Sequence, residues 1–263
     1  MSEILLSLIL GLIQGLTEFL PVSSSAHLLF PSLLFGSNDL GLPFDIAVHA
    51  GTLVAVIFFF RTDLINMTKS FFIKDELLFS DRRLALLLIL ATIPVVIVGF
   101  FASGLIEQRI FSIQSIAWMN LIFAFLLLLA YKYNTHSKEL ITLTIVGALF
   151  IGCFQVFALL PGASRSGTAI TAALFIGLSL KDASKFSFML GIPTILGALV
   201  FLVLDVVNSD VYLNSLSLII GFLVSMFFAF FTIKYFLLFA ERIGMYPFVL
   251  YRVGLGITLL LLI

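Results

Sequence analysis

The stretch "QGLTEFLPVSSSAH", residues 14–27, decides how this chain must fold. Between Glu18 and His27 it places a carboxylate, a proline, three consecutive serines and a histidine, in a chain that is otherwise mostly apolar. A soluble protein can carry such a run in any surface loop, but a membrane protein must keep ionisable groups away from lipid. In a membrane protein, this stretch predicts a polar break that is buried inside the fold.

The composition indicates a membrane protein. The chain has 263 residues, of which 62% are hydrophobic and 11% are charged, and its mean hydropathy is +1.24. A soluble domain of this length needs more polar surface, so the expected class is an all-α polytopic membrane protein. The formal net charge is zero, and we therefore expect no nucleic acid partner.

The apolar segments are of two kinds. A helix needs about 20 residues to cross the bilayer, and eight apolar segments come close to that length, of which six are predicted as transmembrane helices. Segments 26–36 and 166–180 are too short to cross, and each follows a break that contains proline and serine. We predict that they return the chain to the side it came from, as two re-entrant helical hairpins, 4–20 with 26–36 and 141–160 with 166–180. The predicted crossings are 44–60, 84–106, 114–133, 184–204, 216–239 and 247–262.

The two halves of the chain resemble each other at an offset of 140 to 142 residues. The similarity predicts a single integral membrane domain, 1–263, built from pseudo-repeats 1–135 and 136–263. The matching elements are Gly11 to Gln14 with Gly152 to Gln155, Leu20-Pro21 with Leu160-Pro161, Ser24 with Ser164, and "FDIAVHAGTLVAV" (44–56) with "FSFMLGIPTILGA" (186–198).

The repeat predicts an inverted topology. Three crossings per half is an odd number, so the second half is inverted relative to the first, as in many transporters. Basic residues then gather on one side, which is the cytoplasmic side by the positive-inside rule, and both termini lie outside the cytoplasm. The hairpin tips enter from opposite faces and should meet near the midplane. The cytoplasmic set is Arg61, Lys69, Lys74, Arg82, Arg83, Lys132, Lys138, Lys181, Lys185, Lys234 and Arg242, against Arg109 alone on the other side.

The residues of the two tips have the chemistry for a phosphate site. Gln14 and Glu18 are spaced i, i+4, so both oxygens can point at one ligand. Arg165 at a helix start can hold a phosphate with its guanidinium and the free N–H groups. A carboxylate beside such an arginine also favours a bridging divalent cation. The full candidate set is Gln14, Glu18, Ser23, Ser24, Ser25, His27, Gln155, Ser164, Arg165, Ser166 and Thr168.

Each of these residues also has a purely structural interpretation. Glu18 and Arg165 can form a buried ion pair that only locks the hairpins together. Ser25 and Ser166 can be helix caps. His27 suits proton transfer or nucleophilic attack, although a lone buried histidine more often has a structural role. His49 and His136 are interpreted as structural or solvated.

At these residues the sequence resembles the undecaprenyl-diphosphatases, the bacitracin-resistance family of membrane phosphatases. "QGLTEFLPVSSSAH" and "PGASRSG" (161–167) are similar to the two signature motifs, and the resemblance covers the whole chain. It implies hydrolysis of undecaprenyl diphosphate to the monophosphate carrier and phosphate, which recycles the lipid for cell-wall synthesis and confers bacitracin resistance. It also implies a bacterial cytoplasmic (inner) membrane location and a polyprenyl diphosphate substrate. The oligomeric state is left open between a monomer and a homodimer.

The resemblance implies roles for the residues of the motifs. Gln14 and Glu18 are metal ligands for Mg or Ca, and Glu18 is also catalytic. Ser24, His27 and Arg165 are catalytic, and the substrate-binding residues are Ser23, Ser25, Ser164, Ser166 and Thr168. One position departs from the family pattern: Ala169 stands where a threonine is common. Thr168, one residue earlier, is the candidate replacement, although a rotation of about 100° per residue would bring its hydroxyl in from another angle.

Two mechanisms and two other functions stay open at this point. Ser24 attacks phosphorus with His27 as its base, or His27 attacks directly. A lipid-carrier transporter or flippase has the same inverted-repeat architecture. A phosphatase of the acid-phosphatase type, acting on other lipids, fits less well because that chemistry normally uses two histidines.

Overall fold

Helices make up most of the described chain. The computed structural model describes residues 2–28, 40–73, 75–107, 112–134, 137–207 and 214–262. Short 3₁₀ turns cover Glu76–Leu78, Leu140–Thr142 and Val156–Leu159. The α-helices are α1 Glu3–Thr17, α2 Ser24–Leu28, α4 Leu42–Phe59, α5 Arg61–Phe72, α6 Phe79–Glu107, α7 Ile113–Tyr133, α8 Ile145–Gln155, α9 Arg165–Phe175, α10 Leu180–Val207, α11 Ser215–Ile243 and α12 Tyr246–Leu261.

Among the described residues, five segments are long and apolar enough to cross a membrane: Leu42–Phe59, Glu76–Ala102, Ile113–Tyr133, Leu180–Val200 and Ser215–Ile243. These match five of the six predicted crossings, and they confirm the class of all-α polytopic membrane protein. The sixth prediction, 247–262, falls on α12, which has only 16 residues. A full crossing takes at least about 17, so α12 is one residue short of that length and its crossing stays a prediction. α12 is short because Gly244, with φ of 70°, ends α11, and Pro247 lies in the first turn of α12.

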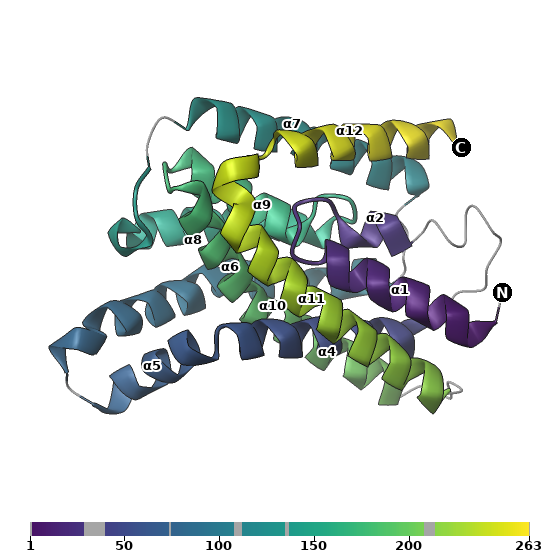
Figure 1. The fold of residues 1–263 in the computed structure, drawn as a ribbon, viewed down its shortest axis with the longest axis horizontal. Coiled ribbons are helices and arrows are strands. Elements are labelled where there is room, and N and C mark those ends of the chain that lie inside the picture. Colours follow the sequence, from purple (N-terminus) through teal and green to yellow (C-terminus); the bar gives the residue numbers. More distant parts are fainter. Residues whose placement is uncertain are drawn as a thin grey trace.

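The two re-entrant segments enter from opposite ends of the molecule, and their tips meet in the middle (Figure 1). α1 has 15 residues and α8 has 11, so neither can cross the bilayer. α9 returns the chain toward the start of α8. The Gly177 carbonyl, which follows α9, accepts the N–H of Lys138, which precedes α8, at 3.0 Å. In the first hairpin the predicted return segment, 26–36, is helical as far as Leu28 and otherwise lies outside the described residues.

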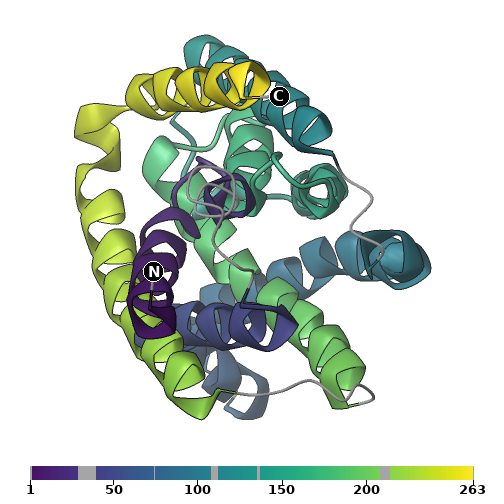
Figure 2. The same ribbon diagram turned by 90° about the vertical axis from the view of Figure 1, so that its right-hand side faces the viewer.

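Helix packing in the first half has a counterpart in the second. α1 and α4 of the first half pack against α11 of the second half. In the same way, α8 and α10 of the second half pack against α6 of the first half. α4 contacts α10, and α7 lies along α12 at the rim of the bundle (Figure 2). The starts of α1 and α4 and the end of α12 lie at the same end of the molecule (Figure 1). This exchange of partners is the packing that an inverted duplication predicts. The boundary at 135/136 falls outside the described residues and stays a prediction.

Glycines bring the helices of the re-entrant segments close to their neighbours. A Cβ on Gly11 of α1 would lie 3.1 Å from the Gly221 carbonyl oxygen of α11. A Cβ on Gly152 of α8 would lie 2.3 Å from the Ala91 carbonyl oxygen of α6. Small residues at such crossings let backbones approach closely, which is how helices associate in lipid. Gly11 and Gly152, which occupy matching positions in the two repeats, thus allow α1 and α8 to pack closely against α11 and α6.

The tightest approach in α4 gives a stability prediction. A Cβ on Gly51 would lie 2.3 Å from both the Phe222 carbonyl oxygen and the Ser225 hydroxyl. Gly51→Ala should therefore force α4 away from α11 and cost about 1–3 kcal/mol. The measurement is the thermal midpoint of the purified protein in detergent. Gly197→Ala on α10 is the matched control, because its Cβ would meet nothing within 4 Å, and an equal loss in both variants would contradict this account.

Both tips pack against the largest hydrophobic cluster of the core, and the first tip also contacts a second one. Residues Ser166 to Leu174 of α9 are all buried, and α9 contributes to the largest hydrophobic cluster together with Phe186 and Phe188 of α10. The first tip contributes Phe19 to the same cluster, where its ring contacts that of Phe188, and it packs Ala26 in a separate small cluster with α7 and α12. The site between the tips is therefore supported by both halves of the chain.

Candidate active site

The turn of each tip contains a serine whose backbone lies in the left-handed region. Ser23 has φ of 71° and Ser164 has φ of 70°, and each directly precedes a helix, α2 or α9. A non-glycine residue at positive φ costs free energy, and such residues cluster at functional sites. Ser23 rather than Ser24 is therefore the structural equivalent of Ser164, which corrects the pairing expected from the sequence.

One extra residue explains this shift of register. Only Val22 separates Pro21 from the left-handed serine in the first tip, whereas Gly162 and Ala163 separate Pro161 from Ser164 in the second. Beyond the turns, Ser24 consequently takes the place that Arg165 takes in the other half. The duplicated scaffold thus presents a hydroxyl from one tip and a guanidinium from the other.

Serines two residues apart link the tips to each other. The Ser23 and Ser25 hydroxyls share a hydrogen bond of 3.1 Å, and the Ser164 and Ser166 hydroxyls share one of 3.3 Å. Ser25 Oγ accepts the Gly162 N–H at 3.3 Å, and Ser166 Oγ donates to the Leu20 carbonyl at 2.9 Å. Ser25 and Ser166 therefore join each loop to the backbone of the other.

A fully buried arginine on α12 holds both loops as well. Arg252 Nη2 donates to the Gly162 and Ala163 carbonyls at 2.9 and 3.0 Å, and Nη1 reaches the Pro21 carbonyl at 3.4 Å. Its Nε donates to Asn120 Oδ1 at 2.9 Å, and Asn120 Nδ2 donates to the Arg252 carbonyl at 2.8 Å. α7 and α12 are in this way connected to the turns of both hairpins.

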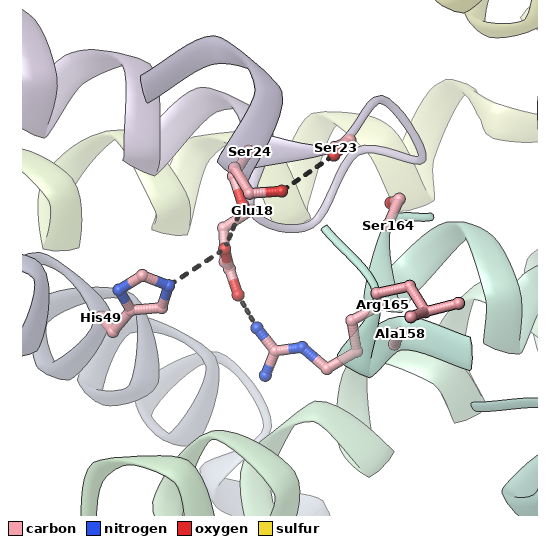
Figure 3. Close-up of a pocket in the computed structure, with 9 residues that line it drawn as sticks. Glu18, Ser23, Ser24, His49, Ala158, Ser164 and Arg165 are labelled. Atoms are coloured by element: carbon pink, nitrogen blue, oxygen red, sulfur yellow. Dashed lines mark hydrogen bonds and ion pairs between the residues drawn. The ribbon is translucent and has the colours of Figure 1, made fainter. Parts of the chain in front are cut away.

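Glu18 is the centre of the site (Figure 3). Its Oε1 forms an ion pair with Arg165 Nη2 of the other tip. Its Oε2 accepts Gln14 Nε2–H at 2.7 Å and the Ser24 hydroxyl at 2.8 Å. His49 Nε2 of α4 lies 3.9 Å from the same oxygen. The acid of one repeat thus meets the guanidinium of the other inside the bundle.

These groups border a cavity of about 160 Å³. The Glu18 side chain is 2% exposed, whereas those of Arg165 and His49 are 23% and 28% exposed. The carboxylate is therefore sealed while its cationic partner stays accessible. The lining residues are Glu18, Ser23, Ser24, Ser25, His49, Ala158, Leu160, Ser164 and Arg165.

His27 lies away from this lining. Its Nδ1–H donates to the Ser23 carbonyl at 2.7 Å, so Nε2 of the neutral ring accepts from the Tyr251 hydroxyl at 2.7 Å. The two rings are parallel, with centroids 5.5 Å apart. In this arrangement His27 supports the Ser23 turn, and the Ser24 hydroxyl donates its hydrogen bond to Glu18 Oε2.

The other candidates from the sequence also lie outside the cavity lining. Thr168 is buried and its hydroxyl donates to the Arg165 carbonyl at 2.8 Å, and Ser166 bonds the first loop. Gln14 is fully buried, and its Oε1 has no hydrogen-bond partner among the described residues. Gln155, its repeat counterpart, has no side-chain partner there either.

His49 is the cavity residue that sequence reasoning missed. From the sequence alone, His49 is interpreted as structural or solvated. The signal was nonetheless available, since an ionisable residue within a predicted crossing is a functional candidate by default. Tyr251 and Arg252 carried a weaker signal, because they lie near the start of a predicted crossing, where polar groups are common.

The fold and the site together define an integral membrane protein with two opposed re-entrant tips and a polar centre suited to phosphoryl groups. Residues 7–258 match the model of the family described as Bacitracin resistance protein BacA. The chain belongs to this family.

Curated relatives cover nearly the whole chain. A protein of Alcanivorax borkumensis, named undecaprenyl-diphosphatase, is 45% identical over 97% of this chain and 97% of its own length. Proteins with the same name from Saccharophagus degradans and Alteromonas mediterranea are each 43% identical, over 99% and 96% of this chain and 98% and 96% of their own lengths.

Proposed function

We propose that this chain hydrolyses undecaprenyl diphosphate to undecaprenyl phosphate and inorganic phosphate, and so recycles the lipid carrier for cell-wall synthesis and confers bacitracin resistance. The observation that carries the proposal is the convergence of Ser24 and Arg165 on Glu18 at one intramembrane cavity. A hydroxyl, a base and an anion-binding cation are the parts that phosphoryl transfer requires.

The second tip is built to hold the diphosphate. Ser164 caps α9 by accepting the Gly167 N–H at 3.1 Å, and the 11-residue helix points its positive end at the cavity. Arg165 is its first residue, so guanidinium and helix start act on the same anion. The ion pair with Glu18 uses Nη2 of the guanidinium, so the other N–H donors of Arg165 can bind phosphate oxygens, and the pair positions the clamp rather than only locking the hairpins.

Charge balance supports a divalent cation. Glu18 and Arg165 cancel in the free site, and a diphosphate brings roughly two to three negative charges. The fully buried Gln14 Oε1, without a partner among the described residues, beside a carboxylate, fits a hard cation that takes oxygen ligands. Gln14 and Glu18 would hold it, with Mg or Ca as the expected ion, and when bound it would neutralise charge that develops on the phosphate oxygens.

Ser24 and Glu18 supply the covalent step. Ser24 Oγ attacks the terminal phosphorus and its proton passes to Glu18 Oε2. The bond from that phosphorus to the bridging oxygen breaks, and the electron pair leaves with undecaprenyl phosphate. Glu18 passes that proton to the departing phosphate oxygen. Water then attacks the phosphoserine and gives a proton to Glu18, the bond from phosphorus to Ser24 Oγ breaks, and Ser24 regains its proton from Glu18 as inorganic phosphate leaves. Attack by His27 is the alternative, and it requires Nε2 to leave the Tyr251 hydroxyl.

The membrane placement follows from charge. Eleven basic residues lie on one predicted side and one on the other, so we place the basic side in the cytoplasm of a bacterial inner membrane and both termini outside. The polyprenyl chain stays among lipid tails while its diphosphate enters the cavity. The same inverted packing favours a transporter as the second candidate function.

Phosphate release from undecaprenyl diphosphate by purified protein, with and without chelator, tests the proposal. Wild type should release phosphate and lose this activity with chelator, and a phosphorylated residue trapped during turnover should map to Ser24 by mass spectrometry.

Ser24→Ala should lose about 10³-fold in rate, whereas Ser80→Ala at an exposed position is the matched control. Phosphate on a histidine would move the nucleophile to that residue. Lipid translocation in liposomes without phosphate release would favour the transporter.

A further inference from the structure

We propose that His49 is a nitrogen ligand of the divalent cation in this site, and that it makes the site bind first-row transition ions more tightly than Mg²⁺ or Ca²⁺. The inference rests on the proposed function, which places a cation beside Glu18. It adds a residue from α4, outside both signature motifs, and it changes the chemical class of ion that the site selects.

His49 is oriented as a metal ligand would be. Its Nδ1–H donates to the Asp45 carbonyl one turn earlier at 2.7 Å, which fixes the tautomer with the lone pair on Nε2. Metal-bound histidines almost always donate their other ring N–H to a carbonyl or carboxylate in this way. The ring lines the cavity, and Nε2 faces Glu18 in Figure 3. The imidazole is thus held before any ligand arrives.

The distance between the two donor atoms suits a shared ion. His49 Nε2 and Glu18 Oε2 are 3.9 Å apart, which is too far for a good hydrogen bond. Ligand atoms that each lie about 2.0–2.2 Å from one cation are separated by about 3–4 Å. An ion between the nitrogen and the oxygen therefore needs only a small movement of either side chain.

Gln14 can supply a third donor by turning its amide. At present Nε2 donates to Glu18 Oε2, and Oε1 has no partner among the described residues. Rotating the amide by half a turn would place Oε1 beside the carboxylate oxygen. Two such oxygens repel each other unless a cation lies between them. Arg165 pairs with the other carboxylate oxygen, Oε1. Turning the amide therefore frees for the ion the Oε2 lone pair that now accepts Gln14 Nε2–H, while the Ser24 hydroxyl keeps its hydrogen bond to the second lone pair of Oε2.

The ligand types decide which ions bind best. An all-oxygen set suits Mg²⁺ and Ca²⁺, whereas an imidazole raises affinity along the series from Mn²⁺ to Cu²⁺. His49→Gln would restore an all-oxygen set of similar reach. We therefore expect the substitution to weaken Co²⁺ binding by about 10-fold or more, to weaken Mn²⁺ binding by a smaller factor, and to change Ca²⁺ binding by less than about 3-fold.

Pulsed electron paramagnetic resonance of bound Mn²⁺ tests this directly, because it detects coupling to a ligand nitrogen without any turnover. The chain has three histidines, so the protein is prepared without a histidine tag. Wild type should show nitrogen coupling, and His49→Gln should lose it while His27→Gln keeps it. Coupling that persists in His49→Gln, or that disappears only in His27→Gln, would overturn the proposal.

A second preparation avoids changing His49 at all. In the His27→Gln, His136→Gln double variant, His49 is the remaining histidine, and labelling with ¹⁵N-histidine should convert the coupling from ¹⁴N to ¹⁵N. An unchanged ¹⁴N signal would overturn the proposal even if His49→Gln did not fold. Phosphate release is measured in parallel with wild type. Mn²⁺-bound, active protein without histidine coupling would reject His49 and retain the proposed function, whereas no release under any condition would reject the function itself.

Discussion

Arg165→Ala is expected to lower the rate of phosphate release by about 10³-fold or more, because arginines that stabilise a transferring phosphoryl group contribute about 10³–10⁵ in rate. Arg165 is the accessible cation of the cavity and the first residue of α9. Its removal leaves Glu18, a buried carboxylate, facing an anionic substrate. The substitution therefore replaces attraction by repulsion at the point of binding.

The conservative variant separates charge from geometry. Arg165→Lys keeps the charge but loses the two-pronged donor pattern that matches phosphate oxygens. We expect it to recover part of the rate and to remain at least about 10-fold below wild type. The matched control is Arg242→Ala, at an exposed position at the end of α11. Wild-type rates in Arg165→Ala, with normal insertion, would remove this residue from the site.

Arg252→Leu is expected to have the second-largest effect, and it acts through the backbone of both tips. The substitution leaves the Gly162, Ala163 and Pro21 carbonyls and Asn120 Oδ1 without their buried donor. Each unsatisfied buried acceptor costs about 1–3 kcal/mol, so a loss of several kcal/mol in stability should accompany a fall in the rate. The thermal midpoint and the rate are measured together.

Arg252→Lys and a control variant on the same helix distinguish the effect of the Arg252 charge from that of its hydrogen bonds. Lysine carries three donors on one nitrogen and cannot reach all four acceptors, so Arg252→Lys should restore most of the stability but little of kcat, while KM stays close to that of wild type. Gly254→Ala on the same helix is the control, because its Cβ would meet nothing within 4 Å. Full activity in Arg252→Lys would show that the charge alone matters.

The Glu18 centre explains why one duplicated motif yields an asymmetric site. The repeats keep the turn serines and their hydroxyl pairs, as Ser23 and Ser164 show. The tip of the second repeat, residues 155–168, contains no glutamate to match Glu18, and the helix after the turn begins with serine in one half and arginine in the other. A shared backbone frame therefore carries base and hydroxyl on one side and the anion clamp on the other.

Hydrophobic runs, proline breaks and charge bias were sufficient to predict the helical class, five of the crossings and two opposed re-entrant tips, because those features depend on transfer of whole segments into lipid. The pairing of Glu18 with Arg165 followed from the predicted topology. The register of the turns did not, since one added residue between Pro161 and Ser164 shifts every side chain after it.

Tertiary packing alone placed His27 against Tyr251, His49 of α4 beside the Glu18 carboxylate, and Arg252 in contact with both loops. Such contacts join residues that are distant in the chain, and helix rotation and backbone approach, rather than local sequence, set their geometry.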